Sequence, residues 1–502
     1  MPTTPGEARP AAKRRQARQG EPAPKAAEIR IRMYRLGVGD CFLLTLPRRD
    51  GTRFHMLIDC GIHMSEADGP NRIRAAAKDI VAQIDSTRGE RLDVVVGTHE
   101  HWDHLSGFHH AAAIFASCKA GKIWCAWTED QQDAFARSLV HNRDKAVAAL
   151  WGAMRRLHMA DGDGAQAAAD DPAWNWQGLL GFFGESPGVG VLAKAAAESM
   201  RTLVASEADI VYRRPGEPPF DGVSDMWRIF VLGPPVDKEA LKHHAPRAGT
   251  GEAYPLAAAE LAAASLAAAV GEGDDPPFGV RYRIPEQAAR SVPFFQDHYW
   301  ADDAPDAPSL AQRGEEGEQG WRRIDDSWMN GAEALALQLD KITNNTSLVL
   351  ALEVGPKAAT DNPVILFAAD AQVGNWLSWA SVEWPDYAGR TVTGPDLLRR
   401  TVIYKVGHHA SHNATPMEGG LEAMQSLRLA LVPTSAEMAG KVKWGTLPWP
   451  SLLDRLTVKA KDGVLRSDLG ASMNTATASG IRVEEEETHF DIFIPLDLKA
   501  TP

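Results

Sequence analysis

Short apolar runs bounded by turn-forming residues recur toward both ends of the chain and predict buried strands. In the middle of the chain apolar residues recur instead at helical spacing, which predicts helices. Alternation of the two patterns is typical of a mixed α/β protein. Strands are expected within residues 37–47, 54–63, 92–97, 122–127, 228–235, 344–354, 364–369, 402–407, 424–435 and 488–496.

The same patterns divide the chain into a core with two insertions. Residues 128–224 predict a helical insertion interrupted by a Gly/Ala/Asp loop, and residues 225–235 return as a core strand. A second insertion over residues 236–330 combines an Ala-rich helix with a flexible acidic connection. Residues 1–27 are expected to form a disordered basic tail. The core domain is therefore expected in two parts, residues 28–127 and 331–502.

A cluster of metal-binding side chains directly follows the strand expected at residues 92–97. His99 and His101 point to the same side of an extended segment, and the chain then turns to present Asp103 and His104. Imidazole and carboxylate ligands suit zinc, with manganese or iron as alternatives. The competing interpretation is a polar loop that is merely rich in histidine.

These residues form an HxHxDH motif, and five further segments accompany it in order. Together they resemble the metallo-β-lactamase-fold hydrolase superfamily, in the branch of the hydrolase domain of ComEC competence proteins and of phosphorylcholine esterases. The resemblance implies an αββα four-layer sandwich, with metal ions at one edge between the sheets. The accompanying segments are GVGDCFLLTLP (37–47), FHMLIDCGIH (54–63), NNTSLVLALEV (344–354) and VILFAADA (364–371), with VIYKVGHHASHN (402–413) closing the series.

Three later residues complete the candidate centre. Asp370 ends an apolar run and could cap a helix or bridge two cations; the resemblance implies bridging. His408 and His409 are adjacent, so their side chains point apart and one of them is expected to face substrate. The resemblance implies His409 as the ligand and His408 as a contact to phosphoryl oxygens. Exchanging these two roles would leave the reaction class unchanged.

The resemblance implies one or two zinc ions and a metal-bound hydroxide as the nucleophile. Such a hydroxide forms near neutral pH because the metal lowers the pKa of bound water to about 7. Asp103 would position the hydroxide and is therefore expected to be catalytic. The first ion would be held by His99, His101 and Asp370, and the second by Asp103, His104, Asp370 and His409.

Other residues have weaker assignments around this centre. Asp59 could hydrogen-bond a ligand imidazole, or could simply be a turn carboxylate before Gly61. Asp40 is a weaker candidate for the same supporting role, and Trp102 is a weak candidate for lining the substrate site.

Two positions depart from the family pattern. Many members supply a further histidine after the strand at 228–235, where this chain offers Gly233. The first ion would then have only three protein ligands, unless the pair at 243–244 substitutes for the missing one. The competence branch also usually carries a histidine where this chain has Trp449.

Composition fits a soluble enzyme and limits its partners. Hydrophobic residues make up 44% of the chain and charged residues 24%, which are globular values. The net charge of −13 argues against broad attraction to nucleic acid, although a local basic groove could still bind it. The four cysteines form no CxxC pair and are expected to be reduced. No secretory signal or membrane-length apolar run is evident, so we expect a cytoplasmic location without membrane contact.

Three functions are compatible with the sequence. The leading one is a metal-dependent phosphodiesterase or nuclease. A hydrolase that opens a lactone, thioester or amide could use the same centre. The third is a non-catalytic module that binds protein partners through its insertions.

Overall fold

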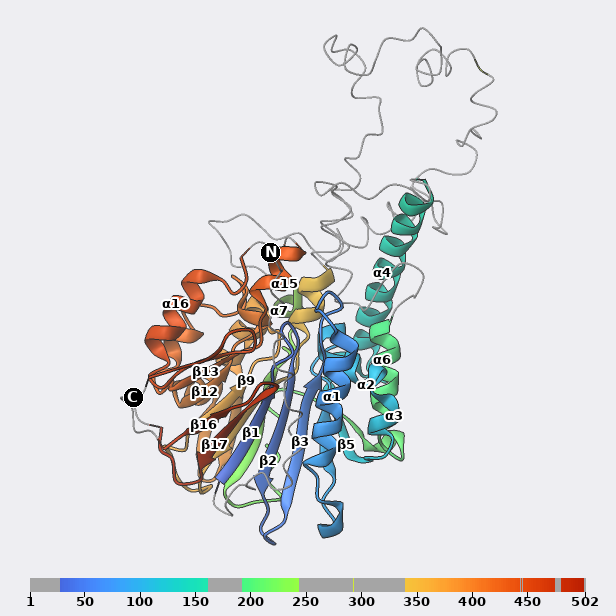
Figure 1. Ribbon diagram of the computed structural model, residues 1–502. Helices are drawn as coiled ribbons and strands as arrows, with labels where there is room; N and C mark the ends of the chain where they lie inside the picture. The colour runs from blue at the N-terminus through green and yellow to red at the C-terminus, as the bar shows by residue number, and fades with distance from the viewer. Residues whose placement is uncertain are drawn as a thin grey trace, which may run out of the picture.

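The computed structural model describes residues 28–160, 192–242, 292, 339–442, 444, 446–474 and 480–500. The predicted tail at 1–27 and almost all of the second insertion after residue 242 lie outside this part of the chain. Within it the fold is mixed α/β and is built around two large sheets (Figure 1).

The first sheet contains eight strands from the two ends of the sequence, in the order β16-β17-β1-β2-β3-β4-β5-β6. Pairing is antiparallel from β16 to β3 and parallel from β3 to β6. The strands are β1 (Glu28–Tyr34), β2 (Cys41–Pro47), β3 (Arg53–Cys60), β4 (Leu92–Val96), β5 (Ala120–Ala126), β6 (Ile210–Arg213), β16 (Arg482–Glu485) and β17 (His489–Pro495).

The second sheet contains seven strands in the order β15-β14-β13-β12-β9-β8-β7. Its central strands β9, β12, β13 and β14 are parallel, whereas β7, β8 and β15 pair antiparallel with their neighbours. The strands are β7 (Trp227–Gly233), β8 (Val349–Val354), β9 (Val364–Phe367), β12 (Thr401–Lys405), β13 (Leu429–Val432), β14 (Gly463–Arg466) and β15 (Gly470–Met473), with β10 (Glu383–Tyr387) and β11 (Arg390–Thr393) forming a separate hairpin.

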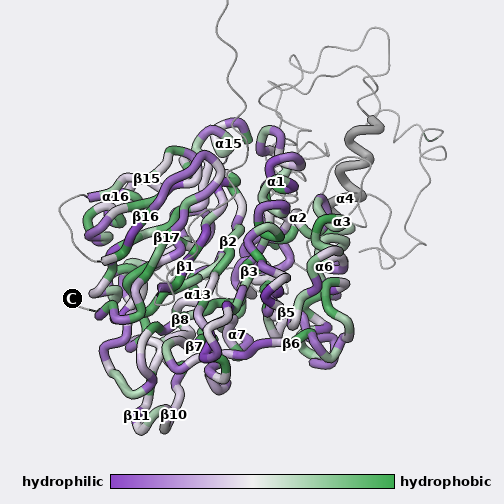
Figure 2. Tube along the Cα trace, turned by 60° about the horizontal axis from the view of Figure 1, so that its bottom comes forward, coloured by the Kyte–Doolittle hydropathy of each residue, from purple (hydrophilic) through white to green (hydrophobic). Residues whose placement is uncertain are grey.

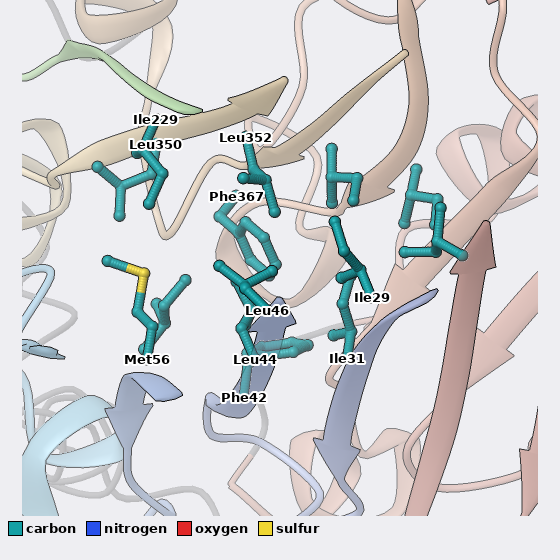
Figure 3. Packing of buried hydrophobic residues seen from close by; sticks show 14 of the residues in the cluster. Ile29, Ile31, Phe42, Leu44, Leu46, Met56, Ile229, Leu350, Leu352 and Phe367 are labelled. Atoms are coloured by element: carbon teal, nitrogen blue, oxygen red, sulfur yellow. The ribbon is translucent and has the colours of Figure 1, made fainter. Parts of the chain in front are cut away.

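One face of each sheet contributes to a shared apolar core. Figure 3 shows Leu44 and Met56 of the first sheet facing Leu350 and Phe367 of the second. Because alternate side chains of a strand point to opposite faces, each sheet also has an outer apolar face that needs cover. Figure 2 shows the hydrophobic segments concentrated in the strands at the middle of the molecule.

Helices cover both outer faces. Apolar residues of α1, α2, α3 and α6 form a second core cluster with the outer face of the first sheet, and those of α13, α14 and α16 form a third with the second sheet. The lower part of α4 lies beside α6, and its far end projects beyond the sheets (Figure 1). The helices are α1 (Gly69–Ala82), α2 (Trp102–His110), α3 (Ala112–Phe115), α4 (Ala134–Ala160), α6 (Leu192–Arg201), α7 (Lys238–Lys242), α13 (Val373–Ser378), α14 (Gly394–Arg399), α15 (Ala436–Lys441) and α16 (Pro450–Lys459).

Seven strands lie outside the strands expected from sequence, namely β1, β6, β10, β11, β14, β15 and β16. β1 pairs with both β2 and β17 at the centre of the first sheet. β6 falls inside the segment 128–224 expected to be a helical insertion, yet it pairs with β5 and extends the sheet. That segment therefore contributes to the core as well as adding helices to it. None of the helices in the described ranges is long and apolar enough to cross a membrane.

Candidate metal centre

The candidate centre lies where strand ends from both sheets meet. β3 and β4 run parallel in the first sheet, as do β9 and β12 in the second. The carboxyl ends of parallel strands share one edge of a sheet, so the loops after them are neighbours. At this edge the N–H of Leu348, just before β8, donates to the Thr98 carbonyl just after β4 (2.9 Å). This bond ties the edges of the two sheets together beside the histidine motif.

Four side chains from three segments that follow strands converge at this edge. Asp103 and His104 begin α2, Asp370 follows β9, and His409 follows β12. One ligand atom of each lies within 4.8 Å of one ligand atom of every other, and all four residues are buried. His409 Nε2 lies 2.8 Å from Asp103 Oδ2, and His104 Nε2 lies 3.1 Å from Asp370 Oδ2. These are the four residues expected to hold the second ion.

The two imidazoles of this cluster are oriented by hydrogen bonds at their Nδ1 atoms. Asp59 Oδ2 accepts from His104 Nδ1 (2.8 Å), and the Pro433 carbonyl accepts from His409 Nδ1 (2.9 Å). A carbonyl can only accept, so His409 Nδ1 carries the hydrogen and Nε2 faces the carboxylates. Asp59 is fixed in turn by the N–H of Thr98 (2.9 Å) and its hydroxyl (2.7 Å). Such partners behind an imidazole are what metal-binding histidines use to set their tautomer.

The pair His99 and His101 lies beside this cluster. His99 Nε2 is 3.1 Å from His101 Nδ1, and both rings are buried. His99 Nδ1 contacts Thr98 Oγ1 (3.1 Å) and Ser347 Oγ (3.4 Å). Among the described residues, however, these two rings form no compact ligand group with Asp370. The ligand set expected for the first ion is thus less closely assembled than that of the second.

A buried lysine compensates part of the negative charge. Lys405, the last residue of β12, contacts Asp40 Oδ2 and lies 3.3 Å from Asp370 Oδ1. Its ammonium group also donates to the Ala369 carbonyl (2.9 Å). One oxygen of Asp370 therefore faces Lys405, and the other faces the two histidines. Asp40, expected to support a ligand imidazole, lies 3.9 Å from His104 Nδ1 and mainly serves as the partner of Lys405.

The carboxylates control the protonation of the clustered imidazoles. Burial disfavours the charged form of His409, but the charges of Asp370 and Asp103 outweigh burial and raise its pKa to about 10. Burial likewise opposes protonation of His104, and the same two carboxylates raise its pKa well above the usual value. Without a cation, protons on these rings would neutralise the carboxylates.

The three histidines beside the cluster have lowered pKa values. Burial lowers the pKa of His101 to about 3 and that of His408 to about 4. Burial, together with the charge of the neighbouring His104, also lowers the pKa of His99 well below its usual value. These three rings are therefore neutral at physiological pH, which is the form that can donate a nitrogen lone pair.

The backbone after β12 adopts an unusual conformation. His408, His409 and Ala410 all have positive φ angles, of 40°, 51° and 63°. Left-handed conformations cost non-glycine residues about 1–3 kcal/mol each and concentrate at functional sites. The turn is held because the N–H of His408 donates to Asp370 Oδ1 (3.1 Å). This conformation directs His409 into the cluster.

His408 lies next to the cluster and is held by a chain of polar groups. Asn344 Nδ2 lies 3.1 Å from His408 Nε2 and donates to Asp340 Oδ1 (3.2 Å). Because an amide nitrogen only donates, His408 Nε2 accepts and its Nδ1 carries the hydrogen, which points to Ser411 Oγ (2.7 Å). The Ser411 hydroxyl then donates to Asn413 (2.9 Å). The contact expected between His408 and phosphoryl oxygens stays a prediction.

Sequence reasoning missed several residues of this site. Asn344 and Ser347 lie in the NNTS segment before β8, to which no side-chain role was assigned. Ser347 Oγ contacts His99 and accepts from the N–H of Asp370 (3.3 Å), so it joins the two sides of the centre. Burial, together with the charges of Asp370 and Asp103, raises the pKa of Asp340 to about 8. The polar NNTS run directly before an apolar strand was the available signal.

Asn375 fills the space at Gly233, where the resemblance implies a further histidine. A Cβ atom on Gly233 would lie 2.0 Å from Asn375 Oδ1, so no side chain fits there. The Asn375 amide donates to the carbonyls of Asn345 (3.1 Å) and Ser347 (2.9 Å). Asn375 thus braces the loop before β8 in place of a ligand. The pair at 243–244 lies outside the described residues.

Two tryptophans singled out in the sequence, Trp102 and Trp449, lie in different surroundings. Trp102 is buried in the cluster beneath α1 and α6, against the ring of His110 (5.2 Å between centroids). It is 1% exposed and therefore belongs to the core, and its role in lining a substrate site stays a prediction. Trp449 is 42% exposed, and its backbone N–H donates to the carbonyl of Ala410, the residue after His409 (2.7 Å).

The donor set fits a divalent transition-metal ion. Asp103 Oδ1, His104 Nε2 and Asp370 Oδ2 are buried and make no hydrogen bond within the described part of the chain. Buried polar atoms without hydrogen bonds are costly, and a cation bound between them would remove that cost. Two imidazole nitrogens and two carboxylates suit zinc, and also manganese or iron.

Comparisons with protein-family models, with curated proteins and with solved structures found no match to this chain.

Proposed function

We propose that this protein is a metal-dependent hydrolase of the metallo-β-lactamase fold that cleaves phosphodiesters. The two facing sheets with helices on both outer faces support the αββα assignment. The observation that carries the proposal is the convergence of Asp103, His104, Asp370 and His409 at the shared edge of the sheets. These residues lie far apart in sequence and would be mutually costly to bury without a cation.

The charge balance supports a cation at this edge. Four buried carboxylates lie here, and Lys405 is the cation that contacts two of them. With neutral histidines the cluster carries an excess of negative charge, which one or two divalent ions would offset. The four carboxylates are Asp40, Asp59, Asp103 and Asp370, of which Asp40 and Asp370 contact Lys405.

Each residue would have a defined task in hydrolysis. His104, His409, Asp103 and Asp370 would hold zinc, with manganese or iron as alternatives, and a second ion would use His99, His101 and Asp370. Bound there, such an ion supplies Lewis acidity and lowers the pKa of water. Asp59 and the Pro433 carbonyl keep the two imidazoles facing the ion. Lys405 keeps one oxygen of Asp370 away from the ligand group.

His408 would contribute to substrate binding at this site. Its ring is fixed by Asn344 and Ser411 and is neutral, because burial lowers its pKa to about 4. Substrate would have to replace Asn344 at Nε2, or reach the ring from another side. The phosphodiester class rests on the resemblance of the HHAS and NNTS segments to the phosphoesterase branch.

Hydrolysis assays on the zinc-loaded full chain test this proposal. The substrates are bis-p-nitrophenyl phosphate, single-stranded DNA and a simple lactone, and chelator-treated protein serves as the control. We expect zinc-dependent cleavage of the phosphodiesters, which is abolished in Asp103→Asn while the fold is retained. Turnover of the lactone alone would favour the carbon-centred hydrolase, and no turnover of any substrate would favour an interaction module.

A further inference from the structure

Glu100 lies between His99 and His101 in the loop after β4, yet the ligand cluster does not include it. The backbone bends at His99 and Glu100, where the N–H of His101 donates to the His99 carbonyl (3.0 Å). Its carboxylate is 9% exposed and faces the helices α4 and α6. A buried carboxylate in this place needs partners of opposite charge.

Two arginines from two helices supply those partners. Arg143 of α4 contacts Glu100 Oε2, and Arg201 at the end of α6 lies 3.6 Å from Glu100 Oε1. Arg201 also lies 3.4 Å from Glu129, which follows β5. The carboxylate is therefore held from two directions by elements of the segment 128–201.

The packing of α6 reinforces this arrangement. A Cβ atom on Gly97, directly after β4, would lie 2.8 Å from the Met200 side chain of α6. Met200 is buried in the cluster that also contains α2. The start of the histidine loop therefore packs directly against α6 through the Met200 side chain.

We propose that Glu100 is a positioning residue, through which Arg143 and Arg201 fix the backbone of the histidine loop and set the affinity of the centre for its metal. This inference rests on the proposed metal centre. It makes the first insertion a part of the site, because α4 and α6 carry the two arginines. Partners that orient ligands indirectly typically change metal affinity by about 10- to 100-fold when removed.

Zinc affinities of full-length variants, measured by competition with a chelator, test the proposal. Glu100→Gln keeps the size of the side chain and removes its charge, and Arg143→Met removes the partner on α4. We expect each variant to weaken zinc binding by about 10- to 100-fold. The double variant should bind zinc about as weakly as the single variants, because both changes remove the same contact between Glu100 and Arg143. Glu100→Asp should restore part of the affinity.

Lys122→Met is the control. Lys122 of β5 pairs with Asp209, just before β6 (2.7 Å), at the part of the strand that lies beside Val94 and not beside the loop. Its zinc affinity should equal that of the wild type. The absorption spectrum of bound cobalt should change in Glu100→Gln and stay unchanged in the control, which a purely structural role would not produce.

The outcomes separate this inference from the proposed function. Wild-type protein that binds no zinc would overturn both. Wild-type protein that binds zinc, with Glu100→Gln and Arg143→Met each within twofold of it, would overturn the positioning role alone. If Glu100→Gln does not fold, Arg143→Met decides the outcome by the same criterion.

Discussion

At the scale of single residues, each clustered imidazole depends on a partner on its far side. His104 donates to Asp59, which also accepts from Thr98 at the end of β4. This contact fixes which nitrogen faces the ligand group. Both Asp59 and Thr98 are buried, so solvent cannot replace the contact.

Replacing Asp59 by asparagine should therefore weaken zinc binding by about 10- to 100-fold. The amide keeps the shape of the side chain but removes the charge that faces His104. Asp50→Asn is a suitable control, because Asp50 is exposed and accepts from its turn neighbour Thr52. Equal zinc affinities in the two variants, measured by chelator competition, would contradict the role of Asp59.

The shifted pKa values predict how the stability of the metal-free protein changes with pH. His409 has a pKa raised to about 10, and that of His104 is also raised. Their contribution to stability is fully present below the unfolded value of about 6.5 and is lost as pH rises through the folded values. His101 and His408 have pKa values lowered to about 3 and about 4, so acid favours the unfolded state below about pH 6.5.

Chelator-treated protein should therefore have its highest melting temperature near pH 6.5. Zinc should remove the loss on the alkaline side, because it replaces protons on the imidazoles. Zinc binding at pH 8 should also release protons, which calorimetry in buffers of different ionisation enthalpy detects. If the melting temperature falls equally above pH 6.5 with and without zinc, these imidazoles do not bind the ion.

At the scale of elements, the centre depends on close backbone approach between the end of β3 and the start of α2. A Cβ atom on Gly61 would lie 2.1 Å from the carbonyl carbon of Asp103. The N–H of Asp40 also donates to the Asp103 carbonyl (3.0 Å). Gly61, the first residue after β3, is therefore required by packing.

Gly61→Ala should push Asp103 out of position. We expect a loss of about 1–3 kcal/mol in the free energy of unfolding, as for overpacked cores, together with weaker zinc binding. Gly222→Ala is the control, because a Cβ atom there would meet nothing within 4 Å. Denaturant unfolding and zinc affinity are the two measurements. A Gly61→Ala protein as stable as the control would contradict this packing.

Most strands could be predicted from sequence because their apolar runs are long and continuous. β6 could not, because its four residues are only half-buried and follow a long helical pattern. β1 alternates charged and apolar residues, and one of its two buried arginines, Arg32, is neutralised by Asp79 and Asp491, which lie far away in sequence. Such pairings depend on the tertiary structure and leave no local signal.

The clustered residues could be predicted where metal-binding side chains follow strands, as at Asp103, His104 and Asp370. The roles of Asn344 and Ser347 could not, because they depend on how the loop before β8 meets the other loops. The role of Glu100 could not be predicted either, because its partners Arg143 and Arg201 lie in the insertion, far from it in sequence.

At the scale of the whole molecule, the ion pairs that stabilise the second sheet are separate from the centre. Glu353, near the end of β8 away from the site, is fully buried. It pairs with Arg228 of β7 (2.8 Å) and with Arg400 before β12 (2.6 Å). Breaking a buried ion pair leaves a charge without compensation.

Glu353→Gln should lower the free energy of unfolding by about 3–5 kcal/mol. Zinc affinity per folded molecule should remain that of the wild type, because the centre lies at the other edge of the sheet. Urea unfolding and chelator competition on the same preparation test both statements. A loss of zinc affinity without a loss of stability would show that the two edges are coupled.

The central claim is that the cluster formed by Asp103, His104, Asp370 and His409 binds a metal ion. Anomalous X-ray diffraction at the zinc edge, from crystals of the full chain grown with zinc, tests it most directly. We predict a peak within bonding distance of the Nε2 atoms of His104 and His409. Zinc-loaded crystals with no peak among these four residues would contradict the claim.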